Sequence, residues 1–227
     1  LGKLKNSFKQ MGIGLDGSRA FNQQRTGVEE YAYQTIRQLA RLWADREVVL
    51  YLKRKQEWKI DFPLPKQWRI KFIPFSNFWT HMGLSWEILS NSPETLFCPA
   101  HVVPIIHPRS IMTVHGLEYE HSPEAYSLYS RLLHRFLVKR GCRWADKIIA
   151  VSEKTKQDLI ELYQIDPRKI EVIHNGVSFF ESRERPIFPE EKGGHLFFVG
   201  RIEQRKNVGT VIKVFEILKQ KYAYSGS

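Results

Sequence analysis

Short apolar runs alternate along the chain with longer stretches in which apolar residues recur every three or four positions. The first pattern is typical of buried strands and the second of amphipathic helices. Strands are expected at residues 13–16, 47–52, 70–73, 96–98, 111–115, 147–151, 170–174 and 196–199. Helices are expected at residues 26–44, 124–144, 154–163 and 208–222. Because strands and helices alternate, the pattern predicts βαβ units around a parallel sheet, which is an α/β fold.

The two longest expected helices each have an apolar face. The helix at 26–44 starts with Thr26 and Glu29, whose spacing is that of a capping box. Its inward face is expected to contain Val28, Tyr31, Ala32, Ile36, Leu39 and Trp43. The inward face of the helix at 124–144 is expected to contain Tyr129, Leu132, Leu133, Phe136 and Leu137. Residues 74–92, rich in Phe and Trp, predict a loop followed by a short helix.

The chain is expected to form one domain over residues 1–180 and to begin a second at residues 195–227. Residues 181–194 are predicted to be a linker, because they contain four Glu, two Pro and a Gly-Gly pair. After the linker the strand and helix pattern restarts, but the sequence stops after one strand and one helix. The second domain is therefore expected to be only begun.

The balance of charge indicates an anionic partner. The chain has 35 Lys and Arg against 24 Asp and Glu, a formal net charge of +11. A nucleotide, an anionic membrane surface or nucleic acid would each suit this charge, and a solvated basic surface is the alternative. Nucleic acid is not expected, because Lys and Arg do not cluster with stacking aromatic residues on one recognisable element.

The cysteine and apolar content predicts a protein of the cytoplasm, located at or near the inner face of the membrane. Cys98 and Cys142 are the only cysteines, so a disulfide framework is not expected and a reducing compartment fits. No apolar run approaches the roughly 20 residues that a membrane-spanning helix needs. The start of the sequence has no signal-peptide pattern, since lysines interrupt its apolar residues.

A basic turn between the last expected strand and helix predicts a phosphate site. Gly200 ends the strand, Arg201 follows it, and Lys206 lies just before the helix. A helix N-terminus has unpaired N–H groups and a positive dipole end, which together with two cations suit a phosphate or diphosphate. The alternative is an ordinary solvated basic turn.

Two further positions carry candidate chemistry. Gly27, at the mouth of a helix after a polar loop, would let a ligand approach the backbone closely, although a flexible connection is equally compatible. His115 lies at the carboxyl end of an expected strand, where ligands bind in open parallel sheets. Glu118, Glu120 and His121 follow it and could meet a sugar hydroxyl or a phosphate. No metal site is expected, because His115 and His121 lack a third ligand at suitable spacing.

One glycine motif would indicate a different ligand, a dinucleotide. Gly12, Gly14 and Gly17 match G-x-G-x-x-G, the dinucleotide fingerprint. That fingerprint follows a strand and opens a helix, whereas these glycines lie within the expected strand and the helix begins only near Gly27. A nicotinamide cofactor is therefore not expected.

Taken together, the motifs resemble those of family-4-type retaining glycosyltransferases of the GT-B fold. The matching residues, in chain order, are Leu15-Asp16-Gly17, Thr26-Gly27-Val28-Glu29, Thr113-Val114-His115-Gly116-Leu117-Glu118, Ala145-Asp146-Lys147-Ile148-Ile149-Ala150-Val151-Ser152, Ile173-His174-Asn175-Gly176-Val177, and Val199-Gly200-Arg201 with Lys206-Asn207. Each motif is weak alone, but six in register over nearly the whole chain are specific.

The resemblance implies two Rossmann-like domains, an acceptor domain followed by a nucleotide-sugar domain, and transfer of a hexose with retention of configuration. The acceptor would be a glycan or glycolipid, in cell-surface polysaccharide or glycolipid assembly. No metal or other cofactor is implied, because cationic groups neutralise the diphosphate. By position, Arg201, Lys206 and Gly27 would bind the donor diphosphate, and His115 would be the catalytic residue beside the transferred sugar.

The resemblance also implies two further contacts to the substrates, and the sequence departs from the family pattern in one respect. Glu118 would contact the acceptor or sugar, as would Asn175 near the interdomain crossover. Family members carry a later pair of glutamates seven residues apart, and nothing up to Ser227 supplies it. The chain alone is therefore expected to be an inactive fragment.

Two other functions remain open at this stage. A non-catalytic GT-B-like module could bind a nucleotide, a glycan or an anionic membrane, and a GT-B epimerase would interconvert a sugar nucleotide without an acceptor. The donor base, the sugar, the acceptor and the oligomeric state are left undetermined by the sequence.

Overall fold

The computed structural model describes residues 11–22, 24–53, 60–75, 78–177, 197–200, 202–203 and 206–222. Within them a seven-stranded sheet has the strand order β3-β2-β1-β4-β5-β6-β7, and every neighbouring pair is parallel. The strands are β1 (Met11–Asp16), β2 (Val48–Lys53), β3 (Trp68–Ile73), β4 (Pro93–Cys98), β5 (Arg109–Val114), β6 (Lys147–Ala150) and β7 (Ile170–Val172). The predicted α/β class and parallel sheet are confirmed.

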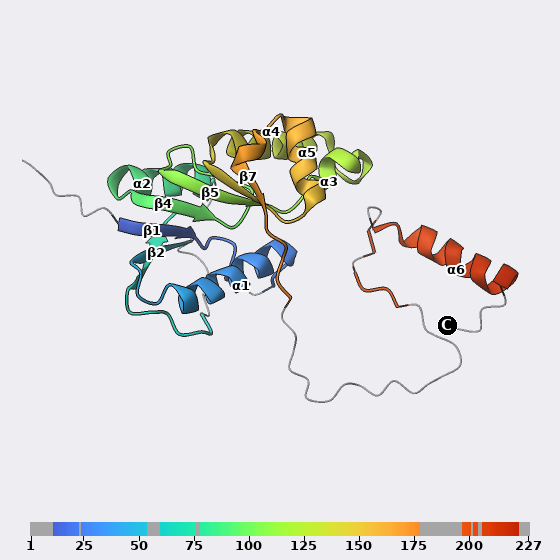
Figure 1. Ribbon diagram of the computed structural model, residues 1–227, viewed down its shortest axis with the longest axis horizontal. Coiled ribbons are helices and arrows are strands. Elements are labelled where there is room, and N and C mark those ends of the chain that lie inside the picture. The colour runs from blue at the N-terminus through green and yellow to red at the C-terminus, as the bar shows by residue number, and fades with distance from the viewer. Residues whose placement is uncertain are drawn as a thin grey trace, which may run out of the picture.

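Helices cover both faces of this sheet (Figure 1). On one face lies α1 (Gly27–Leu42); on the other lie the π-helical turn η1 (Trp79–Leu84), α2 (Ser85–Ser90), α4 (Leu128–Trp144) and α5 (Glu153–Tyr163). The connections contain α3 (Glu118–His121), η2 (Pro123–Ala125) and η3 (Pro167–Lys169), and α6 (Val208–Tyr222) follows further along the chain. Parallel sheets need cover on both faces, because each βαβ crossover places its helix over the strands.

Two apolar cores result, one on each face of the sheet. The core beneath α1 includes Leu15, Ile36 and Leu50, all completely buried. The core beneath α2, α4 and α5 is larger and includes Met112 and Leu159. Cys98 and Cys142 are buried in this second core as free thiols, in agreement with the expectation of no disulfide.

The expected helix at 26–44 is confirmed as α1. The backbone N–H of Thr26 donates a hydrogen bond to Glu29 Oε2 at 2.7 Å, which closes the predicted capping box. Ala32 and Ile36 are buried as predicted. The expected loop and short helix at 74–92 are also present, as η1 and α2.

The predicted inward face of α4 is wrong. Tyr129, Leu132, Leu133 and Phe136 are exposed, and the buried residues are Val138, Gly141 and Cys142. A Cβ on Gly141 would lie 3.4 Å from Met112 Cε, an ordinary contact distance, so this side of the helix packs directly against β5. Hydrophobic periodicity identifies the apolar stripe of a helix but not the element that the helix packs against. In α4 the side with the smaller residues faces the sheet.

The start of α4 and the last expected strand also differ from prediction. The helix begins at Leu128 rather than 124, because Pro123–Ala125 form a separate 3-10 turn and Ser127 Oγ caps α4 by accepting from the N–H of Ser130. Residues 197–199 form no strand, since no described segment pairs with them.

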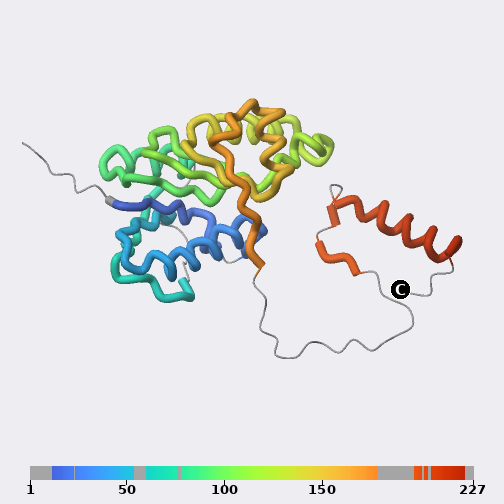
Figure 2. The backbone as a smooth tube through the Cα atoms, viewed as in Figure 1, coloured from blue at the N-terminus to red at the C-terminus, as the bar shows by residue number. Residues whose placement is uncertain are grey.

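The domain boundary stays a prediction, because the proposed linker at 181–194 lies outside the described residues. Figure 2 shows the chain leaving the sheet beyond β7 through residues 173–177. In the described part of the chain, no helix combines the length and apolar character that crossing a bilayer requires.

Packing in the larger core can be tested with two methionines. Met112 is fully buried on β5, whereas Met82 on η1 is 56% exposed. We expect Met112→Ala to lower the free energy of unfolding by about 2–5 kcal/mol, because it leaves a cavity. Met82→Ala should change it by about 0.5 kcal/mol or less. Urea denaturation measures both, and equal losses would contradict the described core.

A second prediction concerns His101, in the loop after β4. Burial, with repulsion from Arg19, His115 and His134, lowers the pKa of His101 from 6.5 to about 4. Between these values the unfolded chain binds a proton that the folded chain does not, so stability falls as pH drops from 6.5 to 4. The loss from this group approaches roughly 3 kcal/mol.

We expect His101→Gln to flatten the dependence of unfolding free energy on pH in this window. The control is His174→Gln, at an exposed position beyond β7. Denaturation series at several pH values measure the slopes, and an unchanged slope in His101→Gln would refute the assignment.

Candidate functional site

The loops after β5 and β6 meet at one edge of the sheet. Val114 and Ala150, the last residues of these strands, are partners in the parallel register. The N–H of Val151 continues the pairing by donating to the carbonyl of Val114. His115 and Ser152 consequently come together, although 36 positions separate them in the sequence.

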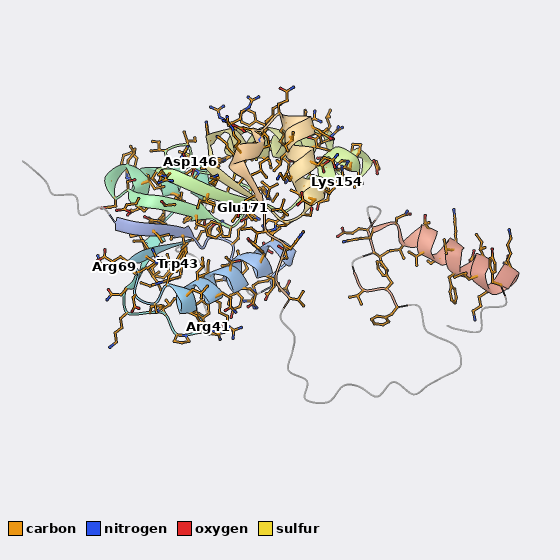
Figure 3. All side chains as sticks on the ribbon, in the orientation of Figure 1. Arg41, Trp43, Arg69, Asp146, Lys154 and Glu171 are labelled. Carbon is orange, nitrogen blue, oxygen red and sulfur yellow. The ribbon has the colours of Figure 1, made fainter. Side chains whose placement is uncertain are left out.

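A pocket of about 350 Å³ opens between these loops. Its lining includes His115, Glu118, His121, Ser152, Lys154 and Lys206. Figure 3 shows Lys154 at this end of the sheet and Asp146, which accepts from the N–H of Ser110 at the start of β5, at the other. The pocket therefore occupies the carboxyl edge, where open parallel sheets bind ligands.

His115 is held in one tautomer by its surroundings. Burial lowers its pKa, so the imidazole is neutral near pH 7. The carbonyl of Pro99 lies 2.9 Å from Nε2 and can only accept, which places the proton on Nε2. The ring of Tyr31 on α1 packs against the imidazole in a T-shaped arrangement, with 4.7 Å between the centroids. Nδ1 of His115 is therefore a hydrogen-bond acceptor.

Gly116 shapes the turn after His115. Its φ of +146° is a conformation that side chains rarely adopt. A Cβ at this position would lie 2.7 Å from Glu118 Oε1. Glycine thus allows the chain to bend into α3 while Glu118 remains beside the pocket.

The opposite wall of the pocket contains the N-terminus of α5. Ser152 caps α5 by accepting from the N–H of Thr155 at 3.1 Å, so the positive end of the helix dipole faces this edge. Asp158, with a side chain only 5% exposed, accepts from His121 Nε2 at 2.7 Å and from Lys154 Nζ at 2.6 Å. The buried carboxylate fixes both groups at the rim and balances the charge of Lys154, so the N-terminus of α5 is the feature of this wall that suits an anion.

Glu120 does not line the pocket but joins three helices. Its carboxylate accepts from Arg135 Nε at 2.7 Å and from the hydroxyl of Tyr163 at 2.9 Å. Tyr163 in turn accepts from the hydroxyl of Tyr119, since its own proton is given to Glu120. The hydrogen bond from Arg135 lowers the pKa of Glu120. This network fixes α3 against α4 and α5.

The structure brings part of the predicted site together. His115, Glu118 and Lys206 line one pocket. Gly27 begins α1, one turn before Tyr31, and a Cβ there would have no neighbour within 4 Å. Asn175 is exposed beyond β7 and is not part of the lining, and Arg201 lies outside the described residues.

Sequence reasoning missed the contribution of α5. Ser152 was expected as the last residue of a matching motif, and no role was predicted for Lys154 or Asp158. One signal was available: Asp158 falls next to Leu159 on the inward face of a helix, where an acidic side chain needs a partner. Among the described residues, no three His, Cys, Asp or Glu side chains are grouped as metal ligands.

Comparison with known proteins identifies the family. The model of Glycosyltransferase Family 4 matches residues 25–179, which is more than half of the chain. The chain is also similar to the O-antigen chain mannosyltransferase RfbU of Salmonella typhimurium, with 26% identity over 130 residues. That match covers 57% of this chain and 35% of the relative, so the chain spans about a third of the relative's length.

The matched range contains the sheet edge from Gly27 through His115 to Asn175. Together with the parallel sheet and its pocket, the match confirms the resemblance found in the motifs: the chain belongs to glycosyltransferase family 4.

Proposed function

We propose that this chain is the acceptor-side part of an enzyme that transfers a hexose from a nucleotide-sugar to a glycan or lipid-linked acceptor, with retention of configuration. The observation that carries the proposal is the pocket in which neutral His115, the α5 N-terminus and Lys206 meet. Such a site offers a hydrogen-bond acceptor, the imidazole of His115, to a sugar hydroxyl on one side. On the other side, a helix N-terminus and Lys206 suit a diphosphate.

In the proposed reaction, the bond between the anomeric carbon and the diphosphate breaks and the acceptor oxygen takes its place. The acceptor's proton leaves with the nucleoside diphosphate. Lys206 and Arg201 would neutralise the charge that develops on the leaving group, without a metal or other cofactor. Gly27, with open space around it, would let the same diphosphate approach the N-terminus of α1.

His115 would contact the transferred sugar. Because its Nε2 is engaged by Pro99, Nδ1 is the atom available to accept a hydrogen bond from a sugar hydroxyl. Glu118, across Gly116, would accept from a hydroxyl of the sugar or acceptor. Asn175, exposed beyond β7, would be a further contact to the sugar or acceptor.

We further propose that the protein works on the cytoplasmic side of a membrane, in peripheral contact with anionic lipid. The formal net charge of +11 supports this location. A lipid-linked acceptor would then be available at the membrane surface.

The proposed activity is tested with the protein containing this chain and a panel of UDP-, GDP- and ADP-sugars. A mannosyl donor should be tried first, because the similar relative is described as a mannosyltransferase. We expect transfer from one donor, detected as a new glycoside with the donor's anomeric configuration. Failure with every donor would contradict the proposal, and interconversion of a donor without an acceptor would indicate an epimerase.

A pair of histidines at opposite ends of β5 tests the site. His115 follows the carboxyl end of the strand, whereas His107 precedes its amino end and contacts Ser110. We expect His115→Ala to lower kcat/KM at least about a hundredfold, because a positioned polar contact to the reacting sugar is lost. His107→Ala should stay within about threefold of the wild type, and similar losses in both variants would contradict the assignment.

A further inference from the structure

Helix α4 presents an apolar stripe to solvent. Tyr129 is 76% exposed, Phe136 is 56% exposed and Leu132 is 51% exposed. With 3.6 residues per turn these three side chains and Leu133 fall on one face, opposite the side that packs on the sheet through Gly141 and Cys142. Leu128, at the start of the helix, extends the stripe to a length of about 12 Å.

The same face becomes cationic towards the C-terminus of the helix. Arg140 and Arg143 lie in line with Phe136, one and two turns further on, and both are exposed. The guanidinium of Arg140 stacks 5.5 Å from the Phe136 ring centroid and 4.7 Å from that of Trp144. Arg135, by contrast, is bound to Glu120 and belongs to the structural network.

No residue of α4 is acidic. Its sequence, LYSRLLHRFLVKRGCRW, contains Arg and Lys but neither Asp nor Glu. A helix with apolar and aromatic residues on one face and cations beside them is typical of helices that lie in the interface of an anionic bilayer. A tyrosine at the level of the lipid headgroups can bury its ring and keep its hydroxyl in water. An arginine can keep its guanidinium in water while its aliphatic carbons cover apolar surface.

We propose that this face of α4, formed by Leu128, Tyr129, Leu132, Leu133, Phe136, Arg140 and Arg143, docks on an anionic lipid surface. Charge complementarity favours lipid over a second copy of the chain, because a copy of the same face offers no acidic partner to Arg140 and Arg143. An exposed cluster of this kind also marks an interaction site rather than scattered surface apolar residues.

The docked face has a fixed relation to the pocket. Glu120 ties α3 to Arg135 of α4, and α3 supplies Glu118 and His121 to the pocket lining. A bilayer held against α4 therefore lies near the pocket and favours a lipid-linked acceptor over a free glycan. This last step rests on the proposed transfer activity, whereas lipid binding by α4 does not.

Vesicle co-sedimentation of the purified 227-residue chain tests the surface. We expect binding to phosphatidylcholine vesicles that contain phosphatidylglycerol, weak binding to phosphatidylcholine alone, and loss of binding at high salt. The double variant Leu132→Ser and Phe136→Ser should bind at least about tenfold more weakly. Its control is Leu42→Ser, which changes a leucine that is 76% exposed on α1, across the sheet.

The charge is tested separately. Arg140→Gln with Arg143→Gln should weaken binding to the anionic vesicles at least about tenfold. Arg41→Gln, an exposed arginine in the last turn of α1, should leave it within about twofold. Because all these side chains are exposed, the variants should keep the far-ultraviolet circular dichroism of the wild type.

Three results would overturn the inference. The first is no binding to anionic vesicles, and the second is an equal loss of vesicle binding in the α4 and α1 variants. The third is a dimer of the wild type in sedimentation velocity that is lost only in the α4 variants. Transfer to a soluble acceptor is measured without vesicles, so failure of lipid docking and failure of the transfer activity are distinguishable.

Discussion

The common direction of the seven strands is the constraint on which the remaining structure depends. Parallel pairing requires each connection to return across a face of the sheet, so helices cover both faces and every strand ends at the same edge. That edge gathers His115, Gly116 and Ser152 from loops far apart in the sequence. The pocket follows from the topology, and the side chains of the loops decide what it can bind.

Fixed polar contacts then give this edge its chemistry. The carbonyl of Pro99 and the lowered pKa of His115 leave a neutral imidazole with one acceptor nitrogen. Asp158 holds His121 and Lys154 at the rim of the same pocket, beside the capped start of α5. A hydrogen-bond acceptor that faces a helix N-terminus and Lys206 is an arrangement suited to a sugar joined to a diphosphate. Family membership and the site geometry therefore both support the proposed glycosyl transfer.

Much of the fold was predictable, because strand runs such as 147–151 and the capping box at Thr26 are local signals. The face that α4 buries was not, since its most apolar stripe is exposed and Gly141 and Cys142 pack instead. The location of His115 at the carboxyl edge was predictable from its place after a strand, whereas its catalytic role stays a prediction. The partners on α5 were not, because their position depends on β6 pairing with β5, which periodicity does not specify.

The apolar stripe of α4 was predicted to lie in the core, but it is exposed, and we interpret its exposure functionally. A helix that packs through small residues leaves its large apolar side chains free for another partner. The network from Glu120 to Arg135 connects that surface to the pocket. In the proposed function, binding at a membrane and transfer at the sheet edge would thus be served by helices that hydrogen bonds join.

The central claim is that the carboxyl edge of β5 and β6 is where an anionic substrate binds. Amide chemical-shift mapping during titration with inorganic pyrophosphate tests it most directly. Binding at this edge predicts saturable shifts at residues 115–118 and 152–155, with residues 107–110 at the opposite edge unchanged. Shifts confined to the basic end of α4, or equal at both edges of the sheet, would contradict it.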